Sequence, residues 1–120
     1  MSICLMVGAA TLALTNPDFT LRWTHSVEKI EWVENWRVQD HALTLTHVAI
    51  KGSGAGMEPA DDARLEDGWW VWEPMTTLPS LTLAASGATG AGWSFCTATT
   101  CTELGANPGA PITVKPCAKK

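Results

Sequence analysis

Residues 25–36 hold the side chains of this sequence that could do chemistry. His25 and Ser26 are adjacent, and three carboxylates, those of Glu28, Glu31 and Glu34, follow them beside two tryptophans. A hydrolase would use the serine as nucleophile and the imidazole as its base, with a carboxylate orienting the ring. Adjacent residues of a strand point to opposite faces, however, and the chain has no Gly-x-Ser-x-Gly elbow. We therefore expect no catalytic residues, and we keep an enzyme using His25 with Glu28 or Glu34 as acid and base as the alternative.

Glu34 is unusual because two-residue alternation places its carboxylate on an apolar face. The other positions of that face are Ile30, Trp32, Trp36 and Val38. A buried carboxylate must find a cation or hydrogen-bond donors, or take up a proton. The sequence offers His25, Arg22 or a tryptophan N–H group for this role. Two arrangements stay open: His25 and Glu34 meet across neighbouring strands as the polar floor of a pocket, or a β-bulge turns Glu34 to solvent.

Two further segments are candidates for ligand or partner contact. Gly52, Gly54 and Gly56 form a glycine-rich run whose backbone N–H groups could bind an anion. The run lacks the Gly-Lys-Ser/Thr ending of a phosphate loop, so a structural turn is the favoured interpretation. Residues 69–72 place tryptophans on both faces of one strand, so one face can enter the core while the other shows indole to solvent. Exposed aromatic patches are typical of interaction surfaces.

The four cysteines allow two disulfides. Cys96 and Cys101 flank a polar turn, and Cys4 and Cys117 would join if the terminal strands pair. Four buried free thiols in a reducing compartment are the favoured alternative, because the first basic residue is Arg22 and a secretory signal needs a charged start. The same argument favours the cytoplasm over the periplasm. No Cys or His pair has the short spacing of structural zinc, so we expect neither a metal nor a cofactor.

Composition limits the class of protein. The chain has 120 residues, of which 46% are hydrophobic and 17% charged, so we expect one folded domain over residues 1–120. The net charge of −4 argues against a nucleic-acid partner, because no basic stripe is available to neutralise phosphates. No apolar run is long enough to cross a bilayer, which predicts no membrane span of its own.

The elements that must position these residues are short strands. Two-residue alternation between turn residues predicts strands over 3–7, 11–15, 19–25, 30–38, 42–50, 69–72, 81–85, 93–96, 101–104 and 112–115. Residues 51–67, rich in Gly, Pro and acidic side chains, are predicted to form one long loop. A short helix over 27–35 is an alternative that the Trp and Val alternation disfavours. About nine short strands predict an all-β fold, a small antiparallel β-sandwich or a partly open barrel.

Three segments resemble a known bacterial family. They are His25-Ser-Val-Glu28, Gly52-Ser-Gly-Ala-Gly-Met-Glu58 and Asp67-Gly-Trp-Trp70. In this order and spacing they resemble the family called domain of unknown function 1850, over nearly the whole chain. That family has no assigned activity. The resemblance implies an accessory role beside TRAP-type solute transporters of the TAXI subclass, with a transporter component or a small organic anion as partner.

The resemblance also marks positions in this chain. The marked positions are His25, Ser26, Glu28, Gly54, Gly56 and Asp67. Together with Glu34 and Gly52 they are the candidate ligand- or partner-binding residues. We therefore expect a non-enzymatic binding or accessory module in which this polar cluster recognises a small ligand or a transporter surface.

Overall fold

The computed structural model describes residues 3–7, 10–15, 17–24, 30–39, 41–51, 60–83, 92–105 and 109–117. The regular elements in these ranges are all β-strands, which confirms the all-β prediction. The strands are β1 (Ile3–Val7), β2 (Ala10–Leu14), β3 (Asp18–Thr24), β4 (Glu31–Gln39), β5 (Ala42–Ile50), β6 (Arg64–Glu66), β7 (Trp69–Trp72), β8 (Thr76–Leu78), β9 (Leu81–Leu83), β10 (Trp93–Cys96), β11 (Cys101–Leu104) and β12 (Ile112–Pro116).

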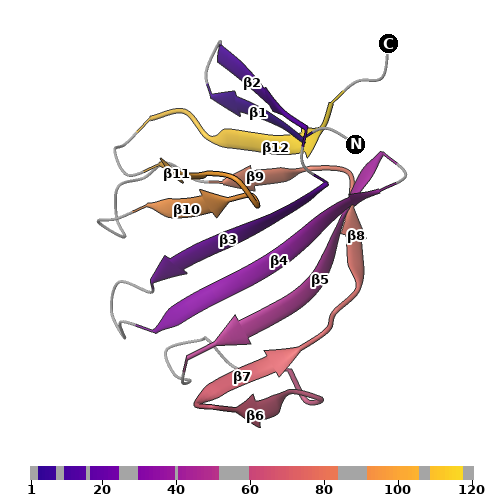
Figure 1. Ribbon diagram of the computed structural model, residues 1–120, viewed down its shortest axis with the longest axis vertical. Coiled ribbons are helices and arrows are strands. Elements are labelled where there is room, and N and C mark those ends of the chain that lie inside the picture. The colour runs from indigo at the N-terminus through magenta and orange to yellow at the C-terminus, as the bar shows by residue number, and fades with distance from the viewer. Residues whose placement is uncertain are drawn as a thin grey trace.

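The strands form two antiparallel sheets of unequal size. The small sheet has four strands in the order β2-β1-β12-β9. The large sheet has eight strands, seven in the order β11-β10-β3-β4-β5-β7-β6, and β8 pairs with β5 outside this path. Figure 1 shows β1, β2 and β12 at one end of the molecule and β6 and β7 at the other. Both sheets are open, in agreement with the predicted sandwich or partly open barrel.

A β-bulge keeps one face of the large sheet apolar. Asn35 of β4 pairs with His47 of β5, but the next residue of β4, Trp36, pairs with Leu45. The register between the two strands therefore shifts by one residue. Thr46 is therefore the extra residue of β5. One extra residue moves the inward positions of β5 from odd to even numbers, so both halves of the strand present buried apolar side chains to the same face.

The main core lies between the two sheets. The small sheet contributes Ile3, Leu5, Leu83, Ile112 and Val114 to it, and the large sheet contributes Phe19, Leu21, Trp36, Val38, Leu43, Phe95 and Leu104. A second, smaller core consists of Ile30, Val48 and Ile50, against which Trp23, Trp32, Leu45 and Trp72 pack. The described part of the small sheet adds no residue to this second core. Among the described residues, the small sheet therefore packs on one end of the inner face, and tryptophans of the large sheet pack on the second core at the other end.

Three sequence-based expectations about elements need correction. Residues 51–67 are not one loop, because Arg64–Glu66 forms β6 and pairs with β7. These three residues lack an alternating apolar pattern. Their pairing with β7 is therefore set by the hairpin turn that connects the two strands. β8 is a second strand that the sequence analysis missed. It pairs with residues 43–45 of β5, after residues 73–75 interrupt the pairing that β7 makes with the same strand. The alternative helix over 27–35 is wrong from Glu31 onward, where β4 begins.

No helix among the described residues is long and apolar enough to cross a membrane.

Candidate functional site, a tryptophan face around Glu34

Four tryptophans meet on the inner face of the large sheet, where Trp23, Trp32 and Trp72 pack on the second core and Trp93 packs against the main core. We call Trp23, Trp32, Trp72 and Trp93 the indole cluster. The ring of Trp23 stacks on that of Trp32 with centroids 5.8 Å apart and touches that of Trp93 at 5.5 Å. The ring of Trp72 meets Trp32 edge-on at 6.2 Å. All four side chains are half-buried, so this part of the face is neither a closed core nor an open surface.

The Glu34 carboxylate lies between two indoles of its own strand. Trp32 donates its Nε1–H to Glu34 Oε2 at 2.9 Å, and Trp36 donates its Nε1–H to Oε1 at 3.0 Å. Side chains two residues apart share one face of a strand, so the Trp-Val-Glu-Asn-Trp order of β4 produces this bridge directly. Trp36 belongs to the main core and Trp32 packs on the second core. Glu34 therefore marks the boundary between the two cores.

This carboxylate has no cationic partner among the described residues. All three arginines of the chain pair with other acids: Arg22 with Glu31, Arg37 with Asp18, and Arg64 with Glu66 and Glu73. A carboxylate has about four lone-pair positions, and two indole donors occupy only two of them. Glu34 is half-buried and keeps acceptor capacity beyond its two indole hydrogen bonds.

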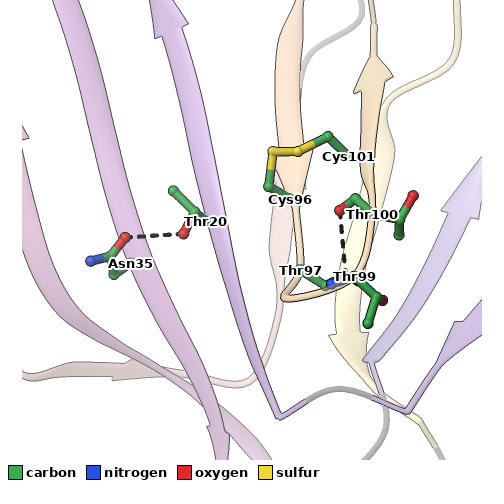
Figure 2. The surroundings of a disulfide bond; sticks show 7 residues. All are labelled: Thr20, Asn35, Cys96, Thr97, Thr99, Thr100 and Cys101. Carbon is green, nitrogen blue, oxygen red and sulfur yellow. Dashed lines mark hydrogen bonds between the residues drawn. A yellow bond between two sulfur atoms is a disulfide. The ribbon is translucent and has the colours of Figure 1, made fainter.

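The outer face of the same strands is polar and well paired. Thr20 donates its hydroxyl hydrogen to Asn35 Oδ1 at 3.1 Å, as Figure 2 shows. The Arg22–Glu31 and Arg37–Asp18 ion pairs are on this face as well, with 41–56% of each side chain exposed. The large sheet thus has an outer face that is charged and solvated, and an inner face on which apolar and aromatic side chains lie around the Glu34 carboxylate.

Of the predicted site residues, the structure describes Glu34 and Asp67. His25, Ser26, Glu28, Gly52, Gly54 and Gly56 lie outside the described residues. The predicted contact between His25 and Glu34 therefore stays a prediction. For Glu34 itself, the tryptophan N–H groups are the partners, one of the options that the sequence offered. A bulge does occur in this sheet, but the extra residue is on β5, and Glu34 stays on the inner face.

The strand ends that flank the family-marked segments are neighbours. Thr24 pairs with Glu31 across the β3–β4 connection, and Lys51 N–H donates to the Glu31 carbonyl oxygen at 3.0 Å. The Lys51 ammonium lies 5.3 Å from the centroid of the Trp69 ring, just after the Asp67–Gly68 turn. The three segments singled out in the sequence therefore begin or end where the ends of several strands of the large sheet lie together, next to the indole cluster.

Asp67 has a structural role at these strand ends. Glu66 pairs with Trp69, so Asp67 and Gly68 are the two central residues of the β6–β7 hairpin turn. Their φ angles are 51° and 85°, the left-handed conformation that a type I′ turn requires at both positions. Asp and Gly are favoured there for this reason. A Cβ at Gly68 would also come within 3.2 Å of the Lys51 ammonium.

The cysteines form two disulfides in the structure, Cys4–Cys117 and Cys96–Cys101. No free thiol is left among the described residues, which include all four cysteines, so the structure differs from the buried free thiols that the sequence favoured. Cys96 pairs with Cys101 at the end of the β10–β11 hairpin, beyond which Thr97 N–H donates to the Thr100 carbonyl oxygen at 2.8 Å (Figure 2). A non-hydrogen-bonded pair next to such a bond has the short Cα separation that a cross-strand disulfide needs, here 4.1 Å.

The other strong polar contact lies on the β6–β7 hairpin. Arg64 donates from Nη1 to Glu73 Oε1 at 3.0 Å and from Nη2 to Oε2 at 2.7 Å. These bonds lower the pKa of the Glu73 carboxyl and raise the pKa of Arg64. Neither residue belongs to the indole cluster. No group of three or more potential metal ligands occurs among the described residues.

Sequence reasoning missed the indole cluster as a unit. It identified the inward positions of β3 and β4 separately, and it treated the Trp69–Trp72 strand as an isolated aromatic run. The order β10-β3-β4-β5-β7 brings the four indoles together from four strands. A high tryptophan content, seven residues with no tyrosine, was the available signal.

Comparison with known families gives one match, which covers most of the large sheet. The profile of one family, described as domain of unknown function (DUF1850), matches residues 19–104, more than half of the chain. The match begins in β3 and ends with β11, so it contains the strands of the large sheet and leaves out β1, β2 and β12. Comparisons with curated proteins and with solved structures found no significant match. The chain belongs to the family described as domain of unknown function 1850.

Proposed function

We propose that this protein is a non-enzymatic binding module whose ligand lies on the indole cluster. One observation carries the proposal: the half-buried Trp32 and the buried Trp36 hold a carboxylate that no described cation neutralises, at the margin of the indole cluster. Indole rings offer flat apolar area at a small cost in conformational entropy, which is typical of binding surfaces. Among the described residues, the small sheet adds none to the second core, whereas it seals the main core completely enough that Leu21 and Val114 have no exposed surface.

The enzyme alternative has less support. That alternative requires His25 and either Glu28 or Glu34 to lie within reach of one reacting proton, directly or through one water. The remaining residues of that alternative, His25 and Glu28, lie outside the described part of the chain. Binding is therefore the function that the described geometry supports best.

The residues predicted from the sequence stay part of the proposal. Segments 25–28 and 52–56 are attached to strand ends beside the indole cluster, so their side chains and backbone are candidates for completing the site. A transporter-associated accessory role, with a transporter component or a small organic anion as partner, belongs to the proposal through the family resemblance. An anion would have to be held by these segments, because the Glu34 charge repels it.

A thermal-shift screen tests the binding proposal. The screen would use small ammonium compounds, amino acids, sugars and dicarboxylates on the wild type and on Trp72→Leu. Trp69→Leu is the matched control, because Trp69 is on the same strand but on the outer face, under Lys51. A ligand that binds only the folded state raises its stability by about 2.7 kcal/mol at one hundred times its Kd.

We expect at least one class of compound to raise the Tm of the wild type and of Trp69→Leu, but not that of Trp72→Leu. His25→Ala in the same screen shows whether segment 25–28 contributes. An equal loss of the shift in both tryptophan variants, or no shift with any compound, would contradict a ligand site on the indole cluster.

A further inference from the structure

We infer that the ligand of the indole cluster is an organic cation, with an ammonium group seated beside Glu34 and against the Trp72 ring. This inference rests on the proposed binding function and specifies its chemical class. It uses only side chains that the structure describes, on β4 and β7.

The charge balance of the inner face supports a cation. Glu34 is the only acidic or basic side chain among the inward positions of the described strands β3, β4, β5 and β7. Its hydrogen-bond partners are two neutral indoles, which fix its position without cancelling its charge. Moving a carboxylate out of water is unfavourable unless it gains donors and an opposite charge. An ammonium group would supply that missing charge.

The geometry places aromatic surface on both sides of that charge. Trp32 is two residues from Glu34 on β4, and Trp72 is two strands away, on the row that runs through Val48. Neighbouring strands are about 4.8 Å apart, so Glu34 and Trp72 are separated by about 10 Å at the backbone, with the small Val48 side chain between them. Val48 is buried, so the larger side chains on either side form the accessible part of this row. A small ammonium ligand can therefore contact the carboxylate and an indole face together.

The chemistry of indole agrees with this assignment. The face of an aromatic ring carries a negative quadrupole, and tryptophan is the strongest cation–π partner among the side chains. The molecule already contains one such contact on its outer face, where the Lys51 ammonium lies 5.3 Å from the Trp69 ring centroid. On the inner face, no described lysine or arginine takes the equivalent place beside Trp32 or Trp72.

The experiment compares choline with its uncharged carbon isostere, in which a quaternary carbon replaces the nitrogen. Both probes would be titrated into the full-length protein with tryptophan fluorescence and NMR of the indole N–H groups as readouts. We expect choline to bind about tenfold more tightly than the isostere at low salt, because only the cation gains from the ring quadrupole and the carboxylate. The advantage should shrink as salt is added.

Two matched variants locate the charge. Glu34→Gln keeps the size of the side chain and one indole acceptor, so we expect it to fold and to reduce the preference for choline to about twofold or less. Glu31→Gln, on the outer face of the same strand, should leave the preference unchanged. The choline-to-isostere ratio on the wild type tests the cation assignment even if Glu34→Gln does not fold.

The outcomes separate the two proposals. Equal binding of both probes, with loss of both in Trp72→Leu, would overturn the cation assignment and leave the binding face in place. Tighter binding of a dicarboxylate than of choline at this face would also overturn it. Failure of Trp72→Leu to weaken any ligand that binds the wild type would remove the binding face itself.

Discussion

The two ends of the inner face of the large sheet share strands β3, β4 and β5, and the described small sheet packs on only one of them, so we call them the covered and the uncovered end. At the covered end, β3 and β4 present Phe19, Leu21, Trp36 and Val38 to the small sheet, and all are nearly inaccessible. At the uncovered end, the same two strands present Trp23 and Trp32, which pack on each other and stay half-buried. Alternation therefore decides which side chains face inward, and the second sheet decides which aromatic rings of β3 and β4 become fully buried.

Removal of the disulfide that joins the strands of the small sheet, Cys4–Cys117, should cause the largest loss of stability. Cys4→Ala with Cys117→Ala opens a link of sequence separation 113, and we expect a loss of about 5 kcal/mol in the free energy of unfolding from the chain-entropy model. Cys96→Ala with Cys101→Ala opens a separation of 5, for which the same model gives about 2 kcal/mol. Urea denaturation of both double variants measures the contrast. Equal losses would mean that the long link does not hold the small sheet in place.

Truncation of one aromatic residue at each end tests the comparison directly. Phe95 is 1% exposed and stacks on Phe19 at 4.9 Å, so Phe95→Ala should cost about 3–5 kcal/mol through the cavity it leaves. Trp72→Ala removes a half-buried ring, and we expect about 1–2 kcal/mol despite the larger side chain. Denaturation midpoints at constant m-value are the measurement. A larger cost for Trp72→Ala would show that the second core contributes as much to stability as the main core.

Removing the carboxylate at the boundary should have an intermediate effect. Glu34→Ala leaves the N–H of Trp36, a residue only 4% exposed, without its acceptor, and we expect a loss of about 1–3 kcal/mol. Glu31→Ala, on the outer face of β4, should change stability by less than about 0.5 kcal/mol. Near-ultraviolet circular dichroism would report the altered indole environment. Unchanged spectra and stability in Glu34→Ala would mean that the two indole hydrogen bonds are dispensable.

A pH dependence at the β6–β7 hairpin should be the weakest of these effects. Arg64 lowers the pKa of the Glu73 carboxyl below its ordinary 4.5, so the pair contributes stability above that pH. The contribution is lost as the pH falls through the lower folded-state pKa, because protonation removes the charge that Arg64 binds. Glu73→Gln should flatten this part of the stability profile, measured by thermal unfolding between neutral and acidic pH. An identical profile for the variant and the wild type would assign the acid sensitivity to other carboxylates.

Strand positions were largely predictable because period-two alternation is a local property. The bounds of β1, β5, β7, β10 and β11 agree with the prediction to the residue. β6 and β8 were missed because three-residue strands carry no periodic signal of their own. The Thr46 bulge was also missed, since a change of parity within β5 becomes visible only against the register of β4.

For the candidate site, the sequence placed Glu34 on an apolar face and named a tryptophan N–H among its partners, because both statements follow from residues two apart on one strand. Which tryptophans gather around it was a matter of tertiary structure. Trp23, Trp72 and Trp93 come from strands far apart in the sequence, and only the strand order brings their rings to Trp32. Local spacing fixes the face of each side chain, whereas the cover over that face depends on how two sheets pack.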